Sequence, residues 1–228
     1  MTFTKKLLPV AITSALLLGA TGASAGELSG NVTLVSDYLF RGISQTDEKG
    51  AIQGGFDYAA DNGLYTGIWA SNVNYGTDSS TEMDYYVGFG GETSGGLGYD
   101  VSYIYFDYEG DSEFDYQEIA ISFSKGDLTV GLNYSDEYLG DGGPDFIYPY
   151  ISYGFSLPSD VSLSLHVGFS DADADDFFEA GEDSYTDYSV GLAKEIMGVE
   201  FGLTYAGTTL DDTDAADDRI VLSLSKSL

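Results

Sequence analysis

The segment VSLSLHVGFS, residues 161–170, is the stretch that decides the fold class of this chain. Its odd-numbered positions are all apolar, and its even-numbered positions are all small or polar. Successive side chains of a β-strand point to opposite faces. The segment therefore predicts a strand that has one face against an apolar medium and the other against a polar one.

The same alternation recurs along the chain and predicts about 12 strands, with 10 to 14 compatible with the pattern. The strands are expected at residues 29–41, 51–60, 64–73, 83–92, 97–108, 116–124, 128–135, 146–156, 160–170, 185–194, 199–208 and 219–228. Short turns rich in Gly, Asn and Pro alternate with longer acidic connections. This order predicts an all-β fold, an up-and-down antiparallel transmembrane β-barrel with its long loops at one end and both termini at the other.

Residues 1–25 are typical of a cleaved secretory signal peptide, and residues 26–228 are then the outer-membrane β-barrel domain. Lys5 and Lys6 precede an apolar stretch, and Ala23-Ser24-Ala25 offers small residues for cleavage. After residue 25 no run approaches the roughly 20 apolar residues of a spanning helix, so strands would have to cross the membrane. We therefore expect export through the periplasm to the outer membrane of a Gram-negative bacterium, with lipid and the barrel-assembly machinery as partners.

A soluble lipocalin-like barrel or a β-sandwich is the alternative, because it too shows alternation, but with the apolar face inward. Small and polar residues dominate the other face of several strands, as at Ser162, Ser164 and Gly168. Aromatic residues gather near predicted strand ends, as the rings of a membrane interface do. Both observations favour the membrane barrel.

The charge and composition exclude several functional classes. The whole chain carries a formal charge of −30, with 8 Lys and Arg against 38 Asp and Glu. Nucleic acid binds clustered positive charge and is therefore not an expected partner, whereas attraction of cations is. The absence of cysteine excludes disulfides, thiolate metal sites and cysteine nucleophiles. The oligomeric state is left open.

Two segments resemble a known family. VSDYLFRGISQT, residues 35–46, resembles the opening of the TorF-type porin family of proteobacteria, and GGFDY with GLYTGIWASNV, residues 54–58 and 63–73, is similar to that family's second and third strands. The resemblance covers most of the chain in layout and is specific only near its start. It implies an outer-membrane barrel and a pore.

If the apolar positions face lipid, a set of charged and polar residues must face the lumen, because a charge at mid-depth in lipid costs a few kcal/mol. These pore-lining candidates are Asp37, Arg41, Asp57, Asp84, Asp100, Glu118, His166, Asp187, Glu200 and Arg219. Acidic rows in a passage favour cations. The alternative is that these groups only hydrate the interior.

Arg41 and Arg219 are the only arginines. Arg41 is expected to end the first strand at the outer rim, and Arg219 to open the last strand beside it, with Asp37 as the partner of Arg41. Two hypotheses follow: a charged constriction that orients solutes, or a rim salt bridge that holds the barrel seam.

The six predicted long loops hold 24 of the 38 carboxylates. In the fifth, Asp171, Asp173, Asp175 and Glu182 have the spacing of positions 1, 3, 5 and 12 of a calcium loop, but Asp176 stands where an EF-hand needs glycine. Loose binding of Ca²⁺ or Mg²⁺ is one interpretation of this group, and a solvated, self-repelling loop is the other. No dedicated cofactor is expected.

An enzyme is not expected. His166 is the only histidine, and residues two apart on one strand lie about 6.5 Å apart, too far for a hydrogen bond from Ser164. The predicted function is that of a porin-like barrel for passive diffusion of small hydrophilic solutes or ions, with a preference for cations. The alternative is a closed structural or interaction barrel whose acidic loops bind divalent cations or a surface partner.

Overall fold

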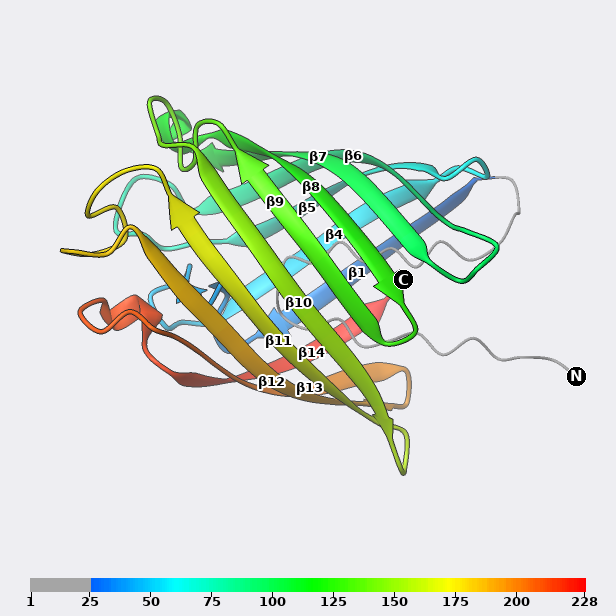
Figure 1. Ribbon diagram of the computed structural model, residues 1–228. Coiled ribbons are helices and arrows are strands. Elements are labelled where there is room, and N and C mark those ends of the chain that lie inside the picture. Colours follow the sequence, from blue (N-terminus) through cyan, green and yellow to red (C-terminus); the bar gives the residue numbers. More distant parts are fainter. Residues whose placement is uncertain (1–25) are drawn as a thin grey trace, which may run out of the picture.

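The computed structural model describes residues 26–228, which form a closed antiparallel barrel (Figure 1). Its twelve strands are β1 (Glu27–Val35), β4 (Ala51–Ala59), β5 (Leu64–Asn72), β6 (Thr81–Glu92), β7 (Gly98–Glu109), β8 (Tyr116–Lys125), β9 (Leu128–Ser135), β10 (Phe146–Leu157), β11 (Val161–Ala172), β12 (Ser184–Ile196), β13 (Val199–Thr208) and β14 (Arg219–Ser227). Each strand pairs with its neighbours in sequence, and β14 pairs with β1 to close the barrel. The predicted fold class and strand number are confirmed.

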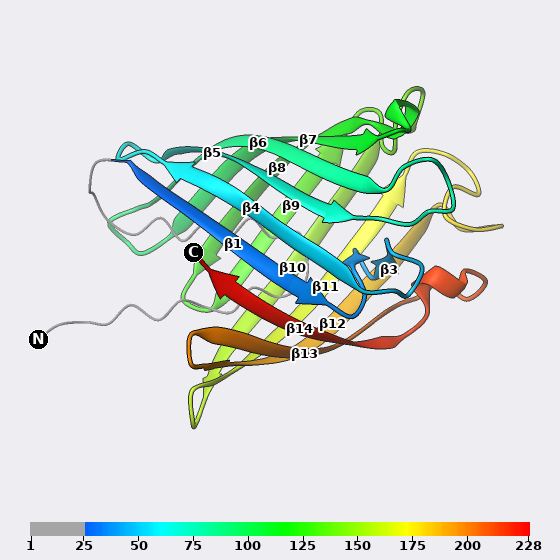
Figure 2. The same cartoon turned by 180° about the vertical axis from the view of Figure 1, so that it is seen from behind.

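The connections alternate in length as the sequence indicates. The long ones gather at one end of the barrel, called here the loop end, and the short turns at the other, the turn end. The C-terminus lies at the turn end (Figure 2). Two short 3₁₀ helices, η1 (Ser112–Phe114) and η2 (Asp214–Ala216), lie in the loops. Between residues 26 and 228 there is no helix long and apolar enough to cross a membrane. The predicted signal peptide lies outside the described residues.

The apolar face of the barrel points outward. On β11, Leu165, Val167 and Phe169 are exposed, whereas His166 and Ser170 on the alternate positions are buried inside. The same parity holds around the barrel, with large apolar side chains exposed on the outer surface of every strand. A lipocalin-like core would reverse this arrangement, so the soluble alternative does not describe this fold.

One boundary differs from the prediction. The first strand ends at Val35 rather than at residue 41, and the chain then turns into the barrel as a separate hairpin of β2 (Leu39–Phe40) and β3 (Ile43–Ser44). The run Tyr38-Leu39-Phe40 breaks the two-residue alternation that a barrel strand needs, because it would place large apolar groups on both faces. Arg41 and Gly42, with φ of +49° and +81°, form the tight turn of the hairpin.

Candidate functional site

The segment from Asp37 to Thr46, called here the inner hairpin, lies inside the loop end of the barrel and contacts its wall on several sides. Tyr38 packs edge-on against Trp69 of β5, with ring centroids 5.4 Å apart, and Phe40 packs against Phe106 of β7 at 6.0 Å. Further contacts reach β6, β8, β10, β12 and β14. The hairpin therefore bridges the lumen rather than lining one side.

Arg41 stands at the tip of the inner hairpin and is buried. Its Nη2 donates to Oε2 of Glu118 on β8 at 2.7 Å. The guanidinium also lies 4.5, 4.7 and 4.3 Å from the ring centroids of Phe40, Phe146 and Tyr148, within the range of cation–π attraction. The expectation that Arg41 ends a strand at the rim is wrong, because the chain leaves the wall six residues earlier.

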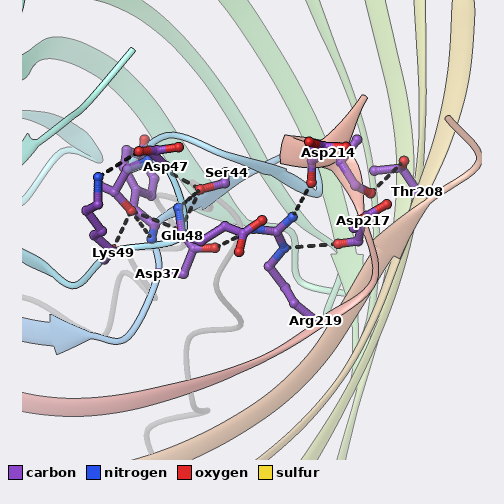
Figure 3. Close-up of polar contacts among 12 residues, drawn as sticks. Asp37, Ser44, Asp47, Glu48, Lys49, Thr208, Asp214, Asp217 and Arg219 are labelled. Atoms are coloured by element: carbon purple, nitrogen blue, oxygen red, sulfur yellow. Dashed lines mark hydrogen bonds and ion pairs between the residues drawn. The ribbon is translucent and has the colours of Figure 1, made fainter. Parts of the chain in front are cut away.

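Arg219 opens β14 at the loop end and joins three parts of the chain (Figure 3). Its Nη1 donates to Oδ2 of Asp37 at 2.8 Å, and its other nitrogens donate to the carbonyl oxygens of Asp214 and Asp217 at 2.9 Å each. Asp37 is thus the partner of Arg219, not of Arg41 as the sequence predicts. The two arginines form separate ion pairs with separate carboxylates.

Asp37 also holds the hairpin in its folded shape. Its Oδ1 accepts hydrogen bonds from the hydroxyls of Ser44 at 2.7 Å and Thr46 at 2.9 Å. The backbone N–H of Tyr38 donates to the Thr46 hydroxyl at 3.1 Å. One buried carboxylate therefore stabilises the hairpin internally and, through Arg219, attaches it to the barrel wall.

A second buried polar cluster lies on β10, β11 and β12. Both ring nitrogens of His166 have polar neighbours. Nδ1 lies 2.8 Å from Ser152 Oγ. Nε2 lies 2.8 Å from the Tyr148 hydroxyl and 3.3 Å from Asp187 Oδ1. The Tyr148 hydroxyl donates to Asp187 at 3.0 Å. Gly168 leaves the space for this tyrosine, since a Cβ there would overlap its ring.

This cluster brings a serine, a histidine and a carboxylate together, which spacing along one strand does not show. Ser152 lies directly opposite His166 on the neighbouring strand, so the contact depends on the register between β10 and β11. The backbone around Ser152 is paired on both sides, with β9 and with β11. Its amides are therefore engaged in the sheet, and the donor pair that stabilises an acyl-transfer oxyanion is not formed there. The cluster acts as a hydrogen-bond chain across the wall.

The other candidates for the lumen also point inward. Asp57 accepts a hydrogen bond from Tyr86, and both are buried. Asp84 is buried next to the inner hairpin. Asp100, which accepts from Tyr65 at 2.9 Å, and Glu200 lie nearer the turn end and are only partly buried.

The lumen thus has two different halves. In the loop-end half, aromatic rings stack beside the hairpin, with centroids 4.4 Å apart for Phe106 and Tyr116 and 3.8 Å for Tyr138 and Phe146. Burial raises the pKa of Tyr138, which lies in the loop after β9, to about 12. In the turn-end half most inward side chains are small and partly exposed, although Tyr65 at the start of β5 is buried. The small ones include Ser122, Ser124, Ser162, Ser164, Gly202, Ser223 and Ser225.

The four carboxylates of the predicted divalent site are not gathered into a ligand set. Asp171 lies on β11, and Asp173, Asp175 and Glu182 lie in the loop that follows. In residues 26–228 no group of three or more His, Asp or Glu side chains is placed to hold a metal ion.

Two other acidic residues attach loops, one to another loop and one to the strands β12 and β13. Glu179 accepts from the backbone N–H groups of Asp211 and Asp212 at 3.1 and 3.0 Å, and these bonds lower its pKa. The hydroxyls of Tyr205 and Tyr188 donate to Asp218 and lower the pKa of that carboxyl.

A bacterial family model matches most of the chain. Residues 19–227 match a family model described as a bacterial protein of unknown function (Gcw_chp). No curated protein sequence matches the chain. The TorF-type family, which segments within residues 35–73 resemble, is not confirmed by these matches.

Solved porin structures share the architecture. A structure described as KdgM porin aligns with a TM-score of 0.55 at 9% identity, covering 89% of this chain and 99% of that one. A structure of NanC porin aligns with a TM-score of 0.53 at 10% identity, covering 88% and 98%. At such low identity the likeness shows a shared fold.

Proposed function

The chain belongs to the bacterial Gcw_chp family, and from that premise we propose that it is a porin-like channel in the outer membrane of a Gram-negative bacterium. It would allow passive diffusion of small hydrophilic solutes or ions, with a preference for cations. Barrels of the KdgM and NanC porins share its fold over nearly their whole length, which supports this proposal.

The observation that carries the proposal is the inside-out distribution of side chains. Outward positions are mostly large and apolar, and most inward positions of the turn-end half are serine, glycine and acids. An apolar outer band suits lipid, and a polar interior suits water and hydrophilic solutes. Lys226, the one break in the apolar face of the last strand, reaches the carbonyl oxygen of Gly198 in a turn at the rim, where a charged amine can stay hydrated.

The preference for cations rests on the charges that face the lumen. The inward guanidiniums are those of Arg41 and Arg219, and each is already paired with an acid. Inward carboxylates occur from the turn end to the loop end, at Asp100, Glu200, Asp57, Asp84, Glu118 and Asp187. A passage with excess negative charge attracts cations and repels anions. The acidic loops at its mouth act in the same direction.

The inner hairpin sets the size limit. Twelve strands lie between the eight that leave a filled interior and the sixteen or more that leave an open channel. Because the hairpin bridges the loop-end half, any solute must pass beside it or displace it. Small ions and solutes are therefore the expected cargo.

Single-channel recording in planar bilayers tests the proposal. We expect discrete current steps from the mature protein, with a reversal potential in a KCl gradient that has the sign of cation preference. If protein that forms a barrel, as shown by heat-modifiable gel mobility, gives no current steps, the channel function is contradicted. Steps with anion preference would contradict only the selectivity.

The second candidate is a closed barrel whose acidic loops bind divalent cations or a surface partner. The observation that favours it is the inner hairpin, with its two ion pairs to opposite parts of the wall. This candidate predicts no current steps and a measurable heat on calorimetric titration with calcium. Current steps together with no heat at millimolar calcium would exclude it.

A further inference from the structure

We propose that the loop-end half of the lumen holds a binding site for one partly hydrated monovalent cation between Asp84, Tyr116 and Glu118. Such a site would hold an ion whether or not the barrel conducts. It shares Glu118 with the Arg41 ion pair but uses the other oxygen of that carboxylate, and it is distinct from the acidic surface loops.

The register of the sheet brings these three side chains to one part of the wall. Asp84 on β6 lies opposite Phe106 on β7, and Phe106 lies opposite Tyr116 on β8. Glu118 follows two residues along β8, on the same inward face. Strands β6 and β8 lie two apart in the sheet, with β7 between them, so both carboxylates face the same sector of the lumen.

Each of the three residues has an oxygen without a partner. Asp84 Oδ1, Glu118 Oε1 and the Tyr116 hydroxyl oxygen are buried and make no hydrogen bond to any other described residue. The side chains are 6%, 1% and 1% exposed. A buried polar group without a partner costs about 1–3 kcal/mol, and more if it is charged, so a bound ion or water is expected beside these oxygens.

The local charge indicates the sign of that ligand. Glu82 lies on the same strand as Asp84, and its oxygens accept from Tyr38 at 2.9 Å and Tyr75 at 3.5 Å. Among residues 26–228, the one cationic side chain that pairs with any of these three acids is Arg41, which binds the other oxygen of Glu118. With all three carboxylates ionised, one guanidinium leaves negative charge uncompensated. A bound cation would offset that charge, and without one a buried acid takes up a proton instead.

The chemistry of the free atoms selects a cation over other ligands. All three free groups carry acceptor oxygens, which bind hard cations. Arg41 Nη1 also lacks a hydrogen-bond partner, but the aromatic rings around the guanidinium already stabilise its charge. Three protein oxygens fall well short of the six to eight ligands that Ca²⁺ takes. Because Arg41 already offsets the charge of Glu118, the remaining charge suits a monovalent ion that keeps some of its water better than a divalent one.

Crystals of the mature protein soaked in thallium(I), a heavy stand-in for K⁺, give the direct test. We expect an anomalous-scattering peak between the carboxylates of Asp84 and Glu118 that disappears in D84N. The matched control is D100N, which removes a lumen carboxylate nearer the turn end and should keep the peak. Heat-modifiable gel mobility establishes that each variant forms a barrel.

Absence of the wild-type peak overturns the site, and so does a peak that D84N leaves unchanged. A peak with Ba²⁺ but none with thallium contradicts the monovalent assignment. If D84N does not fold, the wild-type soak alone decides. Bilayer currents are recorded separately, so loss of the site and loss of the channel can be told apart.

Discussion

The two halves of the lumen are built on the same twelve strands but differ in what fills them. In the loop-end half, the inner hairpin and stacked aromatic rings form a buried cluster, and Ser170 and Val221 have no exposed surface. In the turn-end half, serine and glycine face inward and Asp100 remains partly exposed. Strand number alone therefore does not set the width of a barrel, because inward side chains and one inserted segment decide how much of it is open.

Removing the inner hairpin should have the largest effect on the difference between the two halves of the lumen. Val35 and Ala51 lie directly opposite each other in adjacent strands, so a two-residue Asn-Gly turn can replace residues 36–50 without changing the register. We expect a several-fold rise in single-channel conductance. The control shortens the acidic loop only at residues 173–176, which keeps Phe177 and Phe178 packed against the aromatic rings of the loop end, and should change conductance little. Equal conductance with and without the hairpin would show that it does not obstruct the lumen.

Breaking the buried ion pair should destabilise the loop-end half strongly. Arg41→Ala leaves Glu118 buried without its counter-ion, which costs about 3–5 kcal/mol in free energy of unfolding. Replacing both partners, as in R41M/E118M, should restore most of the loss. Asp100→Ala, in the turn-end half, removes one hydrogen bond from a partly exposed acid and should cost only about 1 kcal/mol. Denaturant unfolding of the folded barrel measures the free energy of unfolding of all three variants. Similar losses for the Arg41 and Asp100 variants would contradict the difference between the two halves of the lumen.

Adding one methyl group to each half should have a smaller but still unequal effect. A Cβ at Gly168 overlaps the ring of Tyr148 within the buried histidine cluster, so Gly168→Ala should cost about 1–3 kcal/mol. A Cβ at Gly202 meets the small side chain of Ser223, whose hydroxyl can rotate away, so Gly202→Ala should cost less than about 1 kcal/mol. The same unfolding measurement ranks the two, and the reverse order would mean that the turn-end half is the more tightly packed.

The smallest expected effect is a pH dependence outside the lumen, in the loops. The pKa of Glu179 is lowered by the N–H groups of Asp211 and Asp212, so its contribution is present above the usual glutamate value of about 4.3 and is lost as pH falls through the lowered value. Hydrogen exchange of these two amides should accelerate below that pH, relative to Glu179→Gln. Identical pH profiles in the wild type and the variant would exclude this loop contact.

The strand pattern could be predicted because each strand alternates on its own. The segments around Leu165 and Leu222 show which face is apolar without any knowledge of their neighbours. The alternation of short and long connections then defines the topology. These features are local in the sequence, and the structure confirms them.

The site could be predicted only in part, because it depends on contacts between distant segments. The inward parity of Asp84 and Glu118 follows from their strands, but the inner hairpin does not, although the unbroken run Tyr38-Leu39-Phe40 is a signal that no barrel strand continues there. The pairing of Asp37 with Arg219, and of Ser152 with His166, depends on register and on the hairpin's path. No spacing along the chain encodes these contacts.

Single-cysteine labelling tests the division of the lumen most directly, since the chain has no native cysteine. Ser223→Cys, in the turn-end half, should react quickly with a small membrane-impermeant thiol reagent, and Ser170→Cys, in the loop-end half, should resist it. Replacing residues 36–50 by the two-residue turn should make Ser170→Cys reactive. Equal labelling rates at both positions in the intact barrel would contradict the division of the lumen into a filled half and a more open half.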